Sequence, residues 1–187
     1  MIDFARERKL ATHLDGARLF NAAAALGIDV GSLAEGYDSV SLCLSKGLGA
    51  PLGSVLVGEA ALIARGRRWR KMLGGGMRQA GIVAAAGLYA LDHHVDRLVE
   101  DHANAQALAD GFAGIEGLTV TPPQSNLVFV DVAPELATRL SEALHERGIA
   151  ANFWPGGRMR WVTHIDVDRV VVDEVIAAVR EITESRI

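Results

Sequence analysis

The sequence has little of what marks secreted, membrane-spanning or nucleic-acid-binding proteins. A single cysteine, Cys43, stands among 187 residues, so no intrachain disulfide can form and a reduced, cytoplasmic setting is expected. The longest apolar stretch, residues 81–91, is shorter than the roughly 20 residues that a bilayer-spanning helix needs. Residues 1–10 are charged and have no apolar core, which argues against a secretory signal. A net charge of −4 and a pI near 5.8 predict neither nucleic acid nor a membrane surface as a partner.

The composition that remains is that of a folded globular protein. Half of the residues are hydrophobic and 22% are charged, and the length suits one domain or a domain and a half. His93 and His94 stand side by side, but adjacent helical residues point in different directions and no partner at i+4 completes a ligand set. We therefore expect no metal site.

The stretch SLCLSKGLGAPLGSVLVG, residues 41–58, is the most informative part of the chain. An apolar run ends in Ser-Lys-Gly, a Gly/Pro turn follows, and a second apolar run begins at Ser54. This pattern predicts strand, turn and strand, with Lys46 where the first strand gives way to the turn. A lysine there is either a surface charge or a desolvated amine suited to Schiff-base chemistry, and the stretch alone leaves both open.

A carboxylate occupies the corresponding place one unit earlier. Asp15 follows a short strand expected at residues 12–14 and precedes a helix expected at 17–26. Lys46 comes 31 residues later, about the length of a βαβ unit. If the two strands are parallel neighbours, both side chains share the sheet edge where α/β proteins bind ligands. An acid and a lysine together suit pyridoxal 5'-phosphate (PLP), because the lysine holds the aldehyde and the acid keeps the pyridine nitrogen protonated.

A glycine loop, residues 74–76, separates a helix expected at 59–73 from one expected to begin near residues 77–79. Glycines before a helix present free N–H groups to an anion, although three glycines often form only a flexible connection. Arg78 favours the anion site, because a guanidinium grips phosphate with two parallel hydrogen bonds. Small residues in the following helix predict close packing on a sheet or on a second copy of the chain.

From residue 117 onward, short strands alternate with helices, which predicts a small α+β module. Arg160 lies on the last expected strand, residues 159–165. Its guanidinium either pairs structurally with Asp166 or another acid, or clamps the carboxylate of an amino acid, whose geometry it matches. The spacing of the residues leaves these alternatives open.

Five long motifs resemble the low-specificity L-threonine aldolases. HLDGARLFNA, CLSKGLGAPLGSVLVG and RWRKMLGGGMRQAGIVAAAGLYAL resemble the family's large domain, and NLVFVDV and RWVTHIDV its small domain. The resemblance implies an α/β, fold-type-I PLP-dependent (aspartate-aminotransferase-like) protein. This chain would supply the C-terminal part of the large domain, residues 1–112, and the small α+β domain, residues 113–187. In that family HLDGAR lies near the middle of the protein, so the N-terminal portion would precede this chain.

The resemblance also implies roles for individual residues. Lys46 is the catalytic lysine that binds PLP, with Asp15, Arg18 and Arg78 as further cofactor-binding residues. Arg18, Lys71 and Arg160 would bind the substrate. The implied reaction cleaves threonine, allo-threonine and related β-hydroxy-α-amino acids to glycine and an aldehyde. The base that acts on the β-hydroxyl is not identified.

Three hypotheses follow from the resemblance. The chain is part of an active aldolase, or it is an inactive remnant or split-enzyme subunit that needs a partner carrying the N-terminal half. A third hypothesis is an aminotransferase or β-eliminating lyase of the same fold type, against which RWRKMLGGGMRQ argues. We expect a homo-oligomer or such a partner, because a parallel sheet needs both faces covered and this chain alone would expose apolar strand edges.

Overall fold

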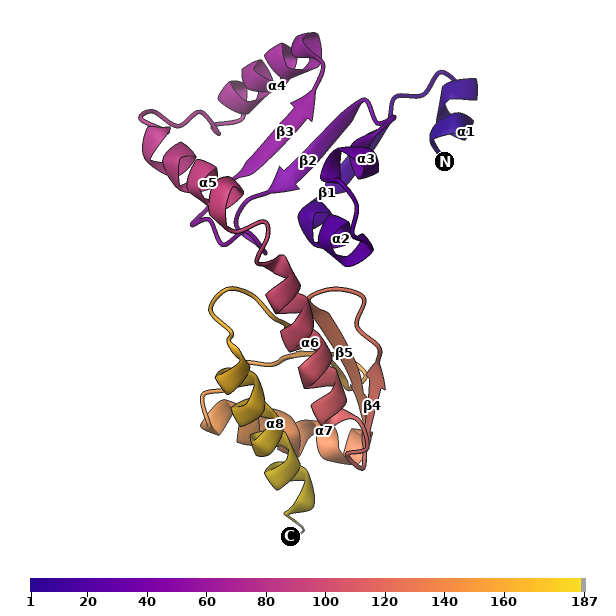
Figure 1. Cartoon of the computed structure of the whole chain (residues 1–187), viewed down its shortest axis with the longest axis vertical. Helices are drawn as coiled ribbons and strands as arrows, with labels where there is room; N and C mark the ends of the chain where they lie inside the picture. Colours follow the sequence, from indigo (N-terminus) through magenta and orange to yellow (C-terminus); the bar gives the residue numbers. More distant parts are fainter. Residues whose placement is uncertain (186–187) are drawn as a thin grey trace. The chain divides into compact units, whose positions relative to one another are not determined.

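The computed structural model describes residues 1–185, which form two compact units, one from Met1 to Leu98 and one from Val99 onward. Figure 1 shows both units, and each is described by itself below. Among the helices described, none has the length and apolar character that crossing a membrane requires.

The N-terminal unit is built on a three-stranded sheet with the order β1-β2-β3. Its strands are β1 (His13–Gly16), β2 (Ser39–Cys43) and β3 (Ser54–Gly58). Its helices are α1 (Ile2–Glu7), α2 (Leu19–Leu26), α3 (Val30–Ala34), α4 (Ala60–Met72) and α5 (Gly81–His93). Strands β1 and β2 are parallel, with Asp15 opposite Ser41, while β3 runs antiparallel to β2. The predicted parallel pair and the strand–turn–strand around Lys46 are therefore confirmed.

The close approach of β1 to β2 depends on Gly16. A Cβ at this position would lie 2.8 Å from the Ser41 carbonyl oxygen, closer than packed atoms approach. The other ends of the two strands are joined by Asp38, whose carboxylate accepts hydrogen bonds from the Thr12 backbone N–H (2.7 Å) and hydroxyl (2.9 Å). The first of these bonds lowers the pKa of Asp38 most, because it favours the charged form.

Much of the N-terminal unit is uncovered. All five residues of β3 are exposed, and α4 buries none of its residues. Val55, Leu56 and Val57 leave 40%, 41% and 48% of their surfaces accessible. The expectation that this chain exposes an apolar strand edge is confirmed.

The C-terminal unit is a four-stranded antiparallel sheet with the order β4-β5-β7-β6. Its elements are α6 (Leu98–Phe112), β4 (Leu118–Thr121), β5 (Leu127–Val132), α7 (Pro134–Glu146), β6 (Asn152–Trp154), β7 (Arg158–Val162) and α8 (Arg169–Glu184). Alternate strand residues such as Val128, Val130 and Met159 are fully buried in one core with Phe112 and Leu140 from the helices. The intervening strand residues lie on the opposite face, as the period of a strand requires.

The predicted α+β module is present, and α6 packs with it. Ala105, Leu108, Ala109 and Phe112 of this helix belong to the core of the C-terminal unit. The compact units therefore separate between Leu98 and Val99, earlier than the domain division expected between residues 112 and 113. That division stays a proposal about the domains of the protein.

Several element ends differ from the expectation. Strand β1 continues to Gly16 rather than ending at residue 14, and α2 begins at Leu19 rather than at residue 17. Helix α5 begins at Gly81 rather than near residues 77–79, because Gln79 adopts a left-handed backbone (φ 48°) that a helix cannot contain. Strand β7 ends at Val162 rather than at residue 165. The Thr163 hydroxyl donates a 2.6 Å hydrogen bond to the Asp101 carbonyl of α6, and the chain then turns towards α8.

Candidate functional site

The structure places Asp15 within the last two residues of β1, rather than after the strand as expected, and Lys46 after the neighbouring parallel strand β2. Asp15 lies on β1, and Lys46 follows the last residue of β2, Cys43, by three positions. Both side chains are exposed. The Asp15 carboxylate accepts a 3.1 Å hydrogen bond from the Ala17 N–H, which fixes the turn into α2. An acid and an amine thus lie along the carboxyl edge of one βαβ unit, the position at which α/β proteins bind ligands.

Helix α2 supports the turn that carries Lys46. A Cβ on Gly47 would lie 2.6 Å from Asn21 Oδ1 and 3.0 Å from Leu98 Cδ2. Both neighbours are buried, with Asn21 2% and Leu98 0% exposed. Gly47 is therefore wedged between two side chains that have no room to move. Asn21 was not predicted as a site residue; its only signal in the sequence is one polar residue inside the alanine-rich segment LFNAAAAL.

The same turn is closed by backbone hydrogen bonds and packs on a small buried cluster. The Gly49 N–H donates to the Lys46 carbonyl (2.9 Å), and the Ala50 N–H donates to the Leu44 carbonyl (2.9 Å). Leu44, Leu48 and Ala50 form a buried cluster with Ala90 and Leu98. The backbone of Lys46 is thus held by a local core, while its side chain reaches solvent.

Cys43, the single cysteine of the sequence, is the last residue of β2 and lies three residues before Lys46. Burial alone raises the pKa of Cys43, but hydrogen bonds from Ser45 and Ser54 and the charge of Lys46 outweigh it, and the net shift is downward. The Sγ atom lies 3.5 Å from Ser45 Oγ. The end of β2 therefore favours a negative charge.

A second group of predicted residues surrounds the glycine loop. The position of a Cβ on Gly76 is 2.6 Å from Lys71 Cδ and 3.3 Å from its Nζ, so the Lys71 side chain folds over the loop. Arg78 follows two residues after Gly76 and is exposed. A bare glycine backbone with a lysine over it and an arginine beside it has the chemistry of an anion site.

The contacts of α5 indicate that Arg78 does not lie beside Lys46. This helix meets the Lys46 turn at its C-terminal half, where a Cβ on Gly87 would lie 3.0 Å from Leu44 Cδ1. His94 Nδ1 lies 2.6 Å from the Leu48 carbonyl oxygen at the same end. Arg78 precedes the other end of α5. Arg18 is the half-buried N-cap residue of α2 and follows Asp15 by three positions in the sequence.

Arg160 belongs to the C-terminal unit, on β7, and two of its surroundings are now defined. Its guanidinium carbon lies 5.6 Å from the centroid of the Trp154 ring. Asp166, the acid considered as its structural partner, instead lies 3.5 Å from His164. Arg158, the neighbour on the same face, pairs with Asp131 at 3.5 Å.

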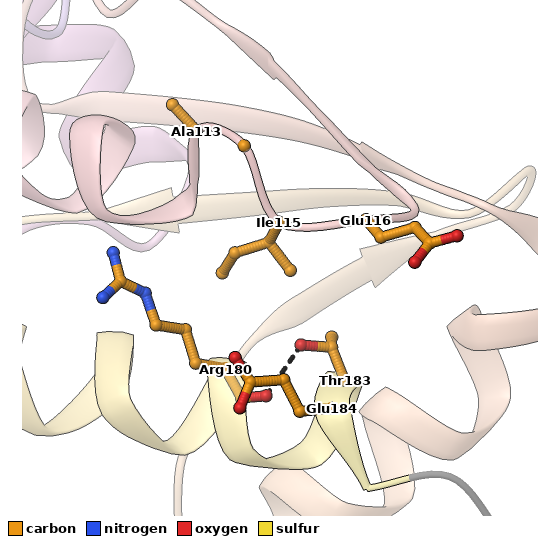
Figure 2. A pocket seen from close by; sticks show the side chains of 7 residues that line it. Ala113, Ile115, Glu116, Arg180, Thr183 and Glu184 are labelled. Carbon is orange, nitrogen blue, oxygen red and sulfur yellow. Dashed lines mark hydrogen bonds between the residues drawn. The ribbon is translucent and has the colours of Figure 1, made fainter.

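A hollow of the C-terminal unit, about 450 Å³, lies between α8 and the loop that follows α6 (Figure 2). It contains none of the predicted site residues. Two of its polar side chains make local hydrogen bonds: Arg180 donates to the Gly111 carbonyl (3.2 Å), and the Thr183 hydroxyl donates to the Arg180 carbonyl (2.8 Å). We assign it no ligand. Within residues 1–185, no group of three or more His, Cys, Asp or Glu side chains gathers as a metal site would require.

The N-terminal unit is an α/β unit with a lysine and a carboxylate along the carboxyl edge of its parallel strands, and an antiparallel α+β unit follows it. This arrangement is that of an α/β protein with a small α+β domain. A sequence model of the Beta-eliminating lyase family matches residues 1–135. The low-specificity L-threonine aldolase of Escherichia coli is 49% identical over 175 residues, which are 94% of this chain and 52% of that protein. Low-specificity L-threonine aldolase 1 of Arabidopsis thaliana is 42% identical over 167 residues, 87% of this chain and 47% of that protein.

Solved structures share the fold. The threonine aldolase of Leishmania major matches with a TM-score of 0.75 at 18% identity, over 97% of this chain and 54% of that one. A structure of SPT with PLP matches with a TM-score of 0.71 at 19% identity, over 97% of this chain and 49% of that one.

The chain belongs to the Beta-eliminating lyase family, and the resemblance to the low-specificity threonine aldolases is confirmed. It spans about half the length of the curated relatives it matches. The expected fold class, an α/β part of a fold-type-I large domain with a small α+β domain, is confirmed as well.

Proposed function

We propose that the chain is the lysine-bearing part of a PLP-dependent lyase that cleaves threonine, allo-threonine and related β-hydroxy-α-amino acids to glycine and an aldehyde. The observation that carries this proposal is the pair Asp15 and Lys46 along the carboxyl edge of parallel strands β1 and β2. They occupy this edge in a chain that is 49% identical, over 94% of its length, to a low-specificity L-threonine aldolase.

The donor set on this edge fits PLP. Bound PLP supplies an electron sink for the bond that breaks at the substrate's α-carbon. The Lys46 amine would hold the cofactor through its aldehyde carbon, and the Asp15 carboxylate would hold a proton at the pyridine nitrogen.

The remaining predicted residues bind anions in this proposal. Arg18, at the start of α2, would contact both cofactor and substrate carboxylate. Lys71 would bind the substrate, and Arg78 the cofactor phosphate. Since Arg78 precedes the end of α5 that lies away from the Lys46 turn, the phosphate that Arg78 contacts would be that of a second copy of the chain. Arg160 would orient the substrate carboxylate with its guanidinium fork.

The second candidate is a subunit that is inactive until another polypeptide covers it. The exposed β3 strand and the uncovered α4 favour this candidate, because an apolar strand edge in water is a site for association. The covering chain would be a second copy or a partner that carries the N-terminal half. The cytoplasmic setting expected from the single cysteine stays a prediction.

The name of the family, Beta-eliminating lyase, makes β-elimination the alternative reaction. The curated relatives favour aldol cleavage, since those that cover 87–94% of this chain are threonine aldolases. With threonine as the substrate, aldol cleavage yields glycine and acetaldehyde, whereas β-elimination yields 2-oxobutanoate and ammonia, so assaying both product pairs distinguishes the two reactions.

The test is threonine cleavage by the purified chain with PLP, alone and mixed with the separately produced N-terminal half of the Escherichia coli relative. Lys46→Ala removes the proposed amine, and Lys9→Ala is the matched control at an exposed lysine outside the site. Lys46-dependent glycine formation by the chain alone supports an active enzyme, and formation only in the mixture supports the second candidate. Cleavage that survives in Lys46→Ala, or is absent from both preparations, contradicts the proposed reaction.

A further inference from the structure

The face of the C-terminal sheet opposite its core carries two arginines and two aromatic rings. Along β7, Met159 and Trp161 are buried in the core, whereas Arg158 and Arg160 lie on the other face. Phe129 of β5 and Trp154 of β6 share that face, with ring centroids 6.0 Å apart. Arg158 lies over Phe129 at 5.1 Å, and Arg160 lies over Trp154 at 5.6 Å.

The two arginines differ in what neutralises their charge. Arg158 is opposite Asp131 in the sheet, lies 3.5 Å from its carboxylate, and donates to the Thr121 hydroxyl at 3.3 Å. Arg160 is opposite Phe129 on one side and Asn152 on the other, and neither is an acid. In the part of the chain that the structure describes, Trp154 is the only side chain in a cation–π, ion-pair or hydrogen-bond contact with Arg160. The Nε atoms of Arg158 and Arg160 are both buried without a hydrogen-bond partner, but only that of Arg158 lies near an acid, 3.5 Å from the Asp131 carboxylate.

The hairpin that joins β6 to β7 fixes the ring and the guanidinium relative to each other. Its turn contains Gly156 and Gly157, with φ of 93° and 84°, values that other residues rarely adopt. The Gly157 carbonyl also accepts a 2.9 Å hydrogen bond from the Val132 N–H of β5. Trp154 and Arg160 thus stand at a fixed register on a closed turn, and Arg160 borders a cavity of about 440 Å³ with Asn152 and His164.

We propose that Trp154 is a positioning residue for Arg160: its ring holds one face of the guanidinium, so that the edge of the fork stays directed at an incoming carboxylate. An arginine without an acid keeps its full charge for the ligand, and stacking on a ring restricts the side chain that must otherwise be ordered on binding. The choice of an amino acid carboxylate as the ligand rests on the proposed function, whereas the stacking itself does not.

The first measurement needs no ligand. In ¹⁵N NMR spectra of the full chain, the Nε–H proton of Arg160 should exchange with water several-fold faster in Trp154→Ala than in the unmodified chain. Trp154→Phe keeps a ring and should restore slow exchange, and the Nε–H signal of Arg158 serves as the internal control in every variant. Equal exchange at Arg160 in the unmodified chain and Trp154→Ala overturns the proposal.

The second measurement is a titration with glycine, and separately with acetate, followed at the Arg160 Nε–H signal. Trp154→Ala should weaken carboxylate binding about 2- to 5-fold, the range expected for an exposed cation–π contact. Trp154→Phe should recover most of the affinity, and Arg158→Gln should bind as the unmodified chain does. Unchanged affinity in Trp154→Ala overturns the positioning role. Faster exchange in Trp154→Ala without a carboxylate response in any variant retains the stacking role and rejects Arg160 as the substrate clamp.

Discussion

Replacing Gly47 with alanine is the sharpest test of how the chain holds Lys46. The added Cβ would lie 2.6 Å from Asn21 Oδ1 and 3.0 Å from Leu98 Cδ2. Neither side chain can swing into solvent, because both are buried. The core around the turn must therefore shift, and overpacking of this kind costs about 1–3 kcal/mol.

That cost has a direct readout in hydrogen exchange. A loss of about 1–3 kcal/mol makes opening about 5- to 150-fold more frequent, so the amides of β1, β2 and the Lys46 turn should exchange faster by that factor. Hydrogen–deuterium exchange with peptide mass spectrometry separates these segments from the C-terminal unit, whose rates should not change.

Gly81→Ala is the matched control for this substitution. A Cβ on Gly81 would meet no atom within 4 Å, and alanine at this helical position is neutral or stabilises by up to about 1 kcal/mol. Combining Gly47→Ala with Asn21→Ala should give less than the summed losses, because the two side chains compete for one space. If the amides of β1, β2 and the Lys46 turn exchange at the same rates in Gly47→Ala and in Gly81→Ala, Gly47 is not tightly packed between Asn21 and Leu98.

Three further outcomes follow from particular contacts. The lowered pKa of Asp38 contributes stability that is complete well above the ordinary carboxyl pKa of 3.8 and is lost as pH falls through the lowered pKa of the folded state. Asp38→Asn should abolish this contribution. If the free energy of unfolding of Asp38→Asn and of the unmodified chain falls in parallel with pH, the prediction is contradicted. Gly111→Ala should destabilise the C-terminal unit by about 1–3 kcal/mol in urea, since its Cβ would collide with Ile176, and Ile176→Ala in the same chain should reduce that loss. Val57→Lys should lower self-association in sedimentation velocity by placing a charge on the exposed β3 edge, and an unchanged distribution would exclude that edge as the contact.

The elements that the sequence predicted well are those set by local patterns. The two apolar runs and the Gly/Pro turn predict the strand–turn–strand of β2 and β3, and the spacing from Asp15 to Lys46 is that of a βαβ unit, in agreement with parallel β1 and β2. The antiparallel pairing of β3 with β2 was not predicted. Arg160 lies on the strand expected over residues 159–165, although β7 begins one residue earlier, at Arg158.

What the sequence could not predict depends on contacts between distant residues. Helix α6 belongs to the C-terminal unit because its apolar side chains pack in that core. The periodicity of the sequence predicts the apolar face of a helix but not which sheet the face packs against. Asn21 beneath Gly47 and Trp154 beside Arg160 become visible only when α2 meets the turn and β6 pairs with β7. The functional roles of Lys46, Asp15, Arg18, Arg78, Lys71 and Arg160 remain proposals.

The central claim is that Lys46 is the amine that holds PLP. The measurement is the absorbance spectrum of the chain with PLP, followed by borohydride reduction and peptide mass spectrometry, with Lys46→Ala and Lys9→Ala in parallel. The account predicts a new visible band and a reduced pyridoxyl group on the peptide containing Lys46, both retained in Lys9→Ala and lost in Lys46→Ala. A spectrum of free PLP only, or pyridoxyl groups spread equally over surface lysines, would contradict it.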